Sequence, residues 1–544
     1  MISKMTFVKR HFVAFLLLPF LVFVAYFNSL SNAFISDDIA SIPNNPAIRN
    51  VGYILSPFFA RNIVYFVAYQ IGGADPMVFR IFNILFHLGT VFLVYLIGYL
   101  MTEKQKTSLV AASLFAVHPI LTESVTWISG GIYAEYTFFM LLSFLLYLLP
   151  ARRSFSVGGS LLSFLLALST SEKAVVLPIV LFVYELSLGN MRGNWKRIIP
   201  YFFMSVVWII LFLWLGLTTR VEHLTSSFGQ RSGLARLRNP LFQVPIVVAS
   251  YLLLLIWPDK LTFFHTEHYY SYTEYFVSLF IFLAFICVTL FLWKKSRLLF
   301  FWLSFFLTSL LPVLTPFRLT SLVAERYVYA GSIGIIFVFA YVLTGLVKSK
   351  WQMYVVIFFT VFIVILLTLR TQMRNTDWKN IDNLWFATAR SAPSSPIVHL
   401  NLADVYSRRK EYRSAELELK IALKLNPNYV DAYHALAVLY RIKKRDDLAM
   451  PMFEKAIELN PNIWQAYVNI GLIYSDRKDY KRALEYMQKA VAVSPSNAAP
   501  RRRLAIVYLN LGQKEKAKKE LTKALELNPD DQVAKERLRE LEGN

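Results

Sequence analysis

Long apolar runs recur over the first 370 residues of this 544-residue chain, and they constrain its fold more than any other feature. Hydrophobic residues make up 56% of the chain and charged residues only 17%, a balance that soluble domains rarely show. About 20 consecutive apolar residues cross a bilayer as one helix, and lipid offers no partner to an irregular backbone. The sequence therefore predicts an all-α chain whose residues 1–370 form a polytopic helical membrane domain.

Lysine and arginine residues mark the turns between the predicted spans. The first apolar segment, residues 11–30, follows Lys4, Lys9 and Arg10, which predicts an uncleaved helix with its N-terminus inside. Basic loops then occupy every second connection, as cytoplasmic loops do. The later basic loops keep this order only if the apolar run 241–257 is a re-entrant or interfacial helix, which gives about eleven spans. An odd number of spans places the C-terminus outside.

The net charge of +22 follows largely from this topology. Residues 1–392 hold 30 Lys and Arg against 15 Asp and Glu, because short basic loops face the cytoplasm. We therefore expect membrane lipid as a partner and no nucleic acid. The single cysteine, Cys287, lies inside an apolar run and excludes intrachain disulfides and cysteine-rich metal sites.

A different pattern begins at residue 393, where residues recur at intervals of 34. Turn prolines, a tyrosine and two registers of alanine at helix crossings are the pattern of tetratricopeptide (TPR) helix pairs. The recurring residues are Pro393, Pro427, Pro461, Pro495 and Pro529; Tyr406, Tyr440, Tyr474 and Tyr508; Ala415, Ala449, Ala483 and Ala517; and Ala422, Ala456, Ala490 and Ala524. The sequence predicts a junction over 371–392, then a TPR α-solenoid of four repeats and a capping helix over 393–544, which binds protein or peptide partners.

Two adjacent carboxylates, Asp37 and Asp38, lie in the polar loop 31–76 that follows the first span. Such a pair alone is more often a solvated loop start than a site, so other residues must decide. Several more polar residues fall in the same loop or at helix ends predicted to face outside: Arg61, His118, Glu123, Lys173 and Arg326. Cations neutralise phosphate, and a carboxylate takes a proton from an incoming hydroxyl. Together they predict a site for a phosphate-bearing substrate.

The order of these motifs resembles one known family over residues 10–544. The motifs are Phe34–Asp38, His118–Trp127, Ser171–Lys173, Ala324–Tyr329 and Arg374–Trp378, the last leading into the repeats. The chain is similar to the transmembrane-and-TPR-containing O-mannosyltransferases and their bacterial relatives, in the GT-C glycosyltransferase superfamily. The resemblance implies a polyprenyl- or dolichyl-phosphate sugar donor, inverting transfer to a protein hydroxyl, and an active site on the non-cytoplasmic face. It also implies a multi-pass protein of a bacterial plasma membrane or an ER-like membrane.

The resemblance also implies roles for single residues. Asp37 matches the general base and Asp38 its partner, which orients the acceptor or tunes the base. His118 and Glu123 fall in one family motif, and Lys173 and Arg326 in motifs that bind the donor phosphate. The chain departs from the family at two places: Arg61-Asn62 replaces Arg-Pro, and Ser171-Glu172-Lys173 replaces Ser-Lys-Glu.

Three hypotheses of function stay open at this point. The first is the glycosyltransferase, which needs no metal for a monophosphate leaving group, although an Asp-rich loop can hold a divalent cation. The second is a non-catalytic, membrane-anchored TPR scaffold for protein partners. The third is a transporter, which the charged residues disfavour because they gather on one face and not at the bilayer midplane. We expect a glycosyltransferase in which the repeats recruit the acceptor.

Overall fold

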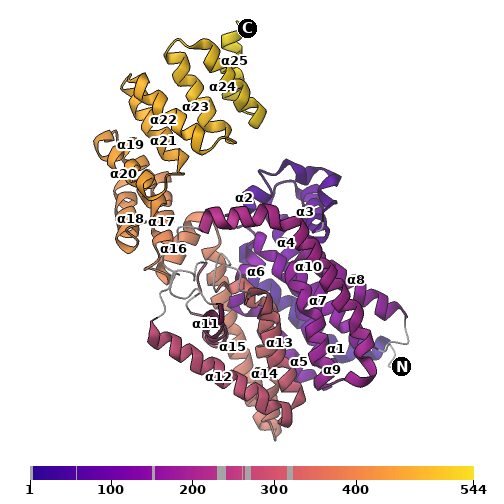
Figure 1. Cartoon of the computed structure of the whole chain (residues 1–544). Helices are drawn as coiled ribbons and strands as arrows, with labels where there is room; N and C mark the ends of the chain where they lie inside the picture. The colour runs from indigo at the N-terminus through magenta and orange to yellow at the C-terminus, as the bar shows by residue number, and fades with distance from the viewer. Residues whose placement is uncertain are drawn as a thin grey trace. The chain divides into compact units, whose positions relative to one another are not determined.

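The structure is a computed structural model that describes residues 4–56, 58–149, 154–228, 240–259, 261–263, 271–314 and 323–543. Every regular element in these ranges is a helix, as predicted. The chain divides into two compact units, Met1–Ser391 and Ala392–Asn544 (Figure 1).

The first unit consists of long apolar helices joined by short turns and one-turn helices. Its helices are α1 (Lys4–Tyr26), α2 (Asp37–Ser41), α3 (Phe59–Gly72), α4 (Pro76–Thr102), α5 (Gln105–Val117), α6 (Thr122–Thr126), α7 (Ile132–Leu148), α8 (Ser154–Thr170), α9 (Leu177–Ser187), α10 (Met191–Phe228), α11 (Pro240–Ile256), α12 (Tyr272–Lys295), α13 (Arg297–Leu310), α14 (Tyr329–Gly345), α15 (Lys350–Asp377) and α16 (Ile381–Ser391). Helix α4 packs against α5 and α7, and α14 packs against α5 and α13.

Seven helices in the described ranges are long and apolar enough to cross a membrane, or eight if the bent pair α5–α6 counts as one. Three shorter apolar helices lie at 156–170, 243–256 and 297–313. The first unit therefore belongs in a membrane, in agreement with the predicted class. The total of about eleven spans, and a non-crossing helix at 241–257, remain predictions.

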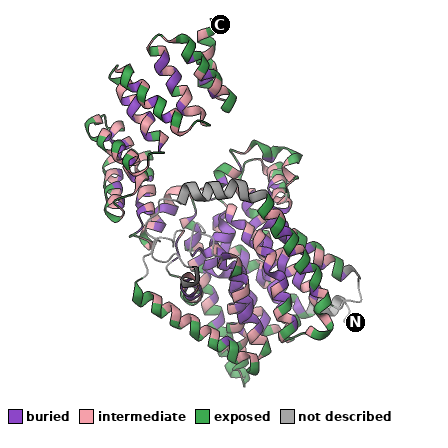
Figure 2. Cartoon of the chain, viewed as in Figure 1, coloured by how far each residue is buried: buried purple, intermediate pink, exposed green. Residues whose placement is uncertain are grey.

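Apolar residues lie on the outside of this unit as well as inside it. Helix α12 exposes Phe276, Phe280 and Leu290 by 62%, 73% and 63%, and of its residues only Thr289 is buried. Figure 2 shows the contrast between α12 and the buried centre formed by α4, α5, α7 and α14. An exposed apolar belt around a packed core is costly in water and favourable in lipid.

The second unit is the predicted TPR array. Its helices pair in sequence order: α17 (Pro396–Arg408) with α18 (Tyr412–Leu425), α19 (Val430–Ile442) with α20 (Asp446–Leu459), α21 (Trp464–Asp476) with α22 (Tyr480–Val493), and α23 (Ala498–Asn510) with α24 (Lys514–Leu527); α25 (Gln532–Glu542) follows. All eight alanines of the two repeating registers are fully buried. Only small side chains let the two helices of each repeat approach this closely.

One turn position repeats in left-handed backbone conformation through all four repeats. Lys410, Lys444 and Lys478 have φ of 61°, 57° and 61°, and Gly512 in the fourth repeat has φ of 74°. The left-handed region is unfavourable for any residue with a Cβ atom. The first three repeats therefore carry a backbone strain that the fourth avoids.

We expect Gly512→Ala to lower the free energy of unfolding of the TPR unit by about 1 kcal/mol, because alanine is strained at this φ. A Cβ at Gly512 meets no described atom within 4 Å, so the effect is conformational and not steric. Chemical denaturation followed by circular dichroism measures the change. The matched variant Lys478→Gly relieves the same strain and should not destabilise the unit; equal losses in both variants would contradict this account.

Candidate functional site

The site is built around an interruption in the membrane helices between α5 and α7. Helix α5 ends at Val117, and the short elements η4 (Pro119–Leu121), α6 and η5 (Ser129–Gly131) follow, with a 52° bend between the two halves of the α5–α6 pair. Non-helical backbone at membrane depth is tolerated only where protein groups satisfy its carbonyls. Helix α4 supplies them: Arg80 Nε donates to Thr126 O (2.8 Å), Asn83 Nδ2 to Trp127 O (3.2 Å) and His87 Nε2 to Ala116 O (3.1 Å).

The two adjacent aspartates lie in very different surroundings at the start of α2. Asp38 is fully buried, and its Oδ1 accepts hydrogen bonds from Ser129 N (2.8 Å) and Ser129 Oγ (2.6 Å). Its Oδ2 accepts from Ile35 N (3.3 Å). Burial raises the pKa of Asp38, and the hydrogen bonds from Ser129 oppose that rise. Asp37 is exposed and its carboxylate receives only a long hydrogen bond from the Ser36 hydroxyl (3.4 Å) among the described groups.

The backbone just before these acids is strained. Ser36 has φ of 50°, a left-handed conformation that a serine adopts only when its surroundings hold it there. Asp38 supplies part of that hold, since its carboxylate joins the loop to η5. Asp38 therefore anchors the loop, whereas the Asp37 carboxylate is exposed and makes no such contact among the described groups.

Glu123, six residues before Ser129, forms an ion pair with Arg326. The Glu123 carboxylate accepts from the backbone N of Arg326 (2.9 Å) and forms an ion pair with its guanidinium. That guanidinium also lies over the rings of Trp127 (5.5 Å) and Tyr327 (4.9 Å). The Glu123 side chain is 1% exposed and that of Arg326 is 14% exposed, so part of the cation stays accessible.

A second cation lies beyond a pair of tyrosines. Lys173 in η6 (Glu172–Val176) lies 5.3 Å from the ring centre of Tyr133, whose ring is 5.9 Å from that of Tyr327. Lys173 Nζ also pairs with Glu172 (2.9 Å). Lys173 and Arg326 therefore each contact one tyrosine of this pair, Lys173 through Tyr133 and Arg326 through Tyr327.

Two of the predicted site residues serve to hold segments together. Arg61 is buried; it donates to Glu135 Oε2 (2.8 Å), Tyr65 Oη (3.0 Å) and Ile128 O (2.7 Å). Burial by itself favours a lower pKa for Arg61. The interactions with Tyr65 and Glu135 are stronger, so the net effect is a raised pKa.

His118 Nε2 donates to Leu255 O (3.0 Å) on α11, and its Nδ1 accepts from Ile120 N (3.3 Å). Both ring nitrogens of His118 are therefore used within the protein. The histidine ties the break after α5 to α11 instead of presenting a ring nitrogen to a ligand.

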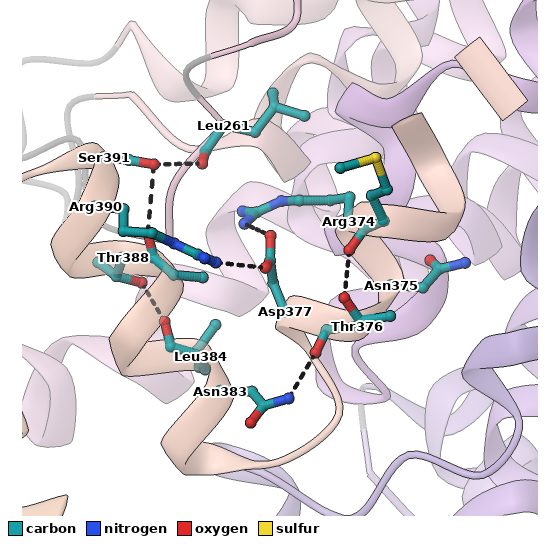
Figure 3. A network of polar contacts seen from close by, with 12 residues as sticks. Leu261, Arg374, Asn375, Thr376, Asp377, Asn383, Leu384, Thr388, Arg390 and Ser391 are labelled. Carbon is teal, nitrogen blue, oxygen red and sulfur yellow. Dashed lines mark hydrogen bonds and ion pairs between the residues drawn. The ribbon is translucent and has the colours of Figure 1, made fainter. Parts of the chain in front are cut away.

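The motif Arg374–Trp378 at the end of α15 forms a further polar network (Figure 3). Arg374 pairs with Glu325 (2.9 Å) and Asp377 (3.0 Å), and Asp377 also meets Arg390 of α16 (3.5 Å). Glu325 directly precedes Arg326, so Arg374 fixes the backbone that carries the partly accessible guanidinium.

The same motif also reaches the break between α5 and α7. Asn375 Oδ1 accepts from the Thr126 hydroxyl (2.7 Å), and Trp378 stacks on Trp127 with ring centres 5.8 Å apart. Ile35, from the loop before the aspartates, belongs to the apolar cluster around these two tryptophans. The acid loop, α6 and the end of α15 therefore pack as one assembly.

Metal ligands do not gather at this site. Among the residues that the structure describes, no group of three or more His, Cys, Asp or Glu side chains is placed to hold a metal ion. The charged groups of the site instead form carboxylate–cation pairs, whose cations can bind phosphate oxygens directly.

We expect Gly130→Ala to destabilise the membrane unit by about 1–3 kcal/mol, because a close-packed site cannot accept another methyl group. A Cβ at Gly130 would overlap the backbone carbonyl oxygen of Glu123, which cannot move without moving the Glu123–Arg326 pair. Thermal unfolding in detergent measures the loss. At exposed Gly158, in α8, a Cβ meets no described atom within 4 Å, and Gly158→Ala should leave stability unchanged or raise it. A stable Gly130→Ala variant would contradict the packing described here.

Comparisons with known proteins identify relatives for both units together. Models of the tetratricopeptide repeat match residues 430–463, 452–485 and 474–539. A protein O-mannosyl-transferase of Caenorhabditis elegans, F38B6.6, is 22% identical over 76% of this chain, and human protein O-mannosyl-transferase TMTC1 is 24% identical over 77%. The chain is a relative of the TPR-containing protein O-mannosyl-transferases. The predicted family resemblance is confirmed.

The match to these O-mannosyl-transferases covers 63% of the worm protein and 56% of the human one, so the chain spans less than two thirds of either relative. Solved structures match a smaller part of this chain. The MamA protein is 23% identical over 27% of this chain and 80% of its own, with a TM-score of 0.24. A thermophilic TPR protein of Thermus thermophilus, TTC0263, is 21% identical over 33% of this chain and 95% of its own, with a TM-score of 0.27.

The motifs that carry the resemblance to the O-mannosyl-transferases do not include the three polar side chains by which α4 holds the site together. Arg80, Asn83 and His87 lie three to four residues apart in an otherwise apolar span, which places them on one helix face. That spacing is a signal in the sequence: polar residues on one face of a span point into the bundle. Ser129 carries no such signal, since an isolated serine in a turn is common.

Proposed function

We propose that the chain is an inverting glycosyltransferase that moves a sugar, mannose by analogy with its relatives, from a polyprenyl- or dolichyl-phosphate donor to a protein hydroxyl. One observation supports this most strongly. The segment from Glu123 to Ser129 carries a cation at one end, through Glu123–Arg326, and the aspartate pair at the other, through Ser129–Asp38. Inverting transfer from a lipid phosphate needs these two charges on opposite sides of the sugar.

In the proposed reaction, Asp37 accepts the proton of the acceptor hydroxyl as its oxygen attacks C1 of the sugar. The bond between C1 and the phosphate oxygen breaks, and the lipid phosphate leaves with the bonding electron pair. Arg326, with Lys173 beyond the tyrosine pair, stabilises the negative charge that develops on that phosphate. Asp38 holds Asp37 in place and stays outside the proton transfer, because all its hydrogen bonds serve the loop.

The proposed donor explains why this chemistry belongs in a membrane protein. A polyprenyl chain keeps the sugar phosphate at the bilayer surface, and the interrupted α5–α6 pair supplies polar groups at such a depth. We place the site and the TPR unit on the non-cytoplasmic side, where the TPR unit recruits the acceptor protein. The phosphate needs no metal, because cations of the chain itself neutralise it.

The test is transfer by the purified full-length chain. The chain, in lipid nanodiscs, is incubated with polyprenyl-phosphate mannose and a Ser/Thr-containing acceptor protein from the same compartment, and mass spectrometry looks for added hexose. We expect hexose on Ser or Thr hydroxyl groups, and NMR of the released glycopeptide should show the anomeric configuration opposite to that of the donor. A chain that binds no lipid-phosphate sugar yet retains a protein on its TPR unit would favour the non-catalytic scaffold instead.

A further inference from the structure

Arg80 is a buried cation with an unusual set of partners. The residue, on the first turns of α4, is 1% exposed, and among the described residues the hydrogen bonds of its guanidinium all go to backbone carbonyl oxygens. Nη1 donates to Asn32 O (2.9 Å) and more weakly to Leu30 O (3.5 Å), Nη2 to Ala33 O (3.3 Å) and Nε to Thr126 O (2.8 Å). Among the described residues it forms no ion pair, and Asp38 and Asp75 balance its charge at longer range.

These carbonyls belong to two segments with different tasks. Residues 30–33 lead directly to the loop of Asp37, and Thr126 lies three residues after Glu123, which holds Arg326. One planar guanidinium thus joins the segment that carries the carboxylate to the segment that carries the phosphate-binding cation. A neutral side chain can satisfy the carbonyls of one segment at much lower cost of burial, as Asn83 does one turn later for residues 125–128.

We propose that Arg80 is a positioning residue, which sets the separation between the Asp37 carboxylate and the Arg326 guanidinium. The inference rests on the proposed function, because that separation matters only if both groups act on one substrate. A misplacement of about 1 Å between reacting groups costs roughly 100-fold in rate while binding energy stays nearly unchanged. Lysine at this position keeps the charge but cannot span both sets of carbonyls.

The variants are Arg80→Lys and Arg80→Gln, with Arg197→Lys as the matched control. Arg197 also donates to a backbone carbonyl, Tyr147 O (3.0 Å), but lies on α10, away from the acid loop. For each full-length variant in nanodiscs, three quantities are measured: kcat for sugar transfer, the Kd of polyprenyl-phosphate mannose, and amide hydrogen exchange of residues 31–41. Arg80→Gln removes the buried charge, so it provides a folded variant if Arg80→Lys does not fold.

We expect Arg80→Lys and Arg80→Gln to lose at least about tenfold in kcat with the donor Kd changed less than about threefold. Exchange of residues 31–41 should rise, and Arg197→Lys should match the wild type. A variant with normal kcat, or with kcat lost and exchange unchanged, overturns the role of Arg80. If the wild-type chain transfers no sugar, the proposed function fails. In that case, unchanged exchange in the Arg80 variants also overturns the positioning role. Raised exchange instead supports the conclusion that Arg80 holds residues 31–41 in place.

Discussion

Asp37→Asn should reduce sugar transfer by about 10²–10⁴-fold, the contribution of a general base, while the chain still folds. Asparagine cannot accept the proton of the acceptor hydroxyl at neutral pH. Asp37 is exposed and contributes little to packing, so the melting temperature should change by no more than a few degrees. The loss should fall on kcat, with donor Kd unchanged, because the carboxylate acts on the acceptor side.

Asp75→Asn is the matched control for this variant. Asp75 belongs to the same loop, residues 31–76, and caps α4 by accepting from Met77 N (2.9 Å), a task that asparagine performs equally well. Its activity should equal that of the wild type. Full transfer by Asp37→Asn would refute the role of Asp37 and, with it, the proposed direction of proton transfer.

The second large effect is expected at the Glu123–Arg326 pair. Arg326→Gln leaves the Glu123 carboxylate buried without its counter-ion, which should cost about 3–5 kcal/mol of stability. The double variant Glu123→Gln/Arg326→Gln replaces the pair by two neutral amides of similar size and should regain most of that loss. Both variants should bind the proposed donor roughly 10- to 100-fold more weakly, because each lacks the guanidinium that we propose contacts the phosphate.

This comparison separates stability from donor binding. Thermal unfolding in detergent gives the first quantity, and equilibrium binding of polyprenyl-phosphate mannose gives the second. If the double variant regains donor affinity together with stability, then Arg326 has only a structural task. Independent behaviour of the two quantities supports contact between Arg326 and the phosphate.

The sequence predicts the TPR unit well because the same residue types recur at the same positions of every repeat. A buried alanine at each helix crossing recurs at a fixed interval, so one repeat checks the next. The sequence predicts the membrane class equally well, because the length of the apolar runs alone indicates membrane-spanning helices. The strained lysines Lys410, Lys444 and Lys478 are different: lysine has no preference for left-handed backbone, so only the structure reveals them.

The site is predictable only in part, because its geometry depends on contacts to backbone carbonyls. Asp37 and Asp38 look alike in the sequence, yet one is exposed and the other is held by Ser129. His118 belongs to a family motif, but the structure gives both its ring nitrogens to the backbone. Residue identity does not encode such contacts, because every residue has a carbonyl. Assignments of Asp37, Lys173 and Arg326 to substrate remain predictions.

The polar face of α4 has a consequence for biogenesis. A lone helix entering the bilayer with Arg80, Asn83 and His87 would expose them to lipid, which is unfavourable for polar side chains without partners. Arg80 also donates to residues 30–33, but Thr126 O, Trp127 O and Ala116 O lie on a segment that the ribosome makes later. We therefore expect the polar face of α4 to find its full set of partners only when the α5–α7 region arrives. Membrane entry and assembly of the site become a single event.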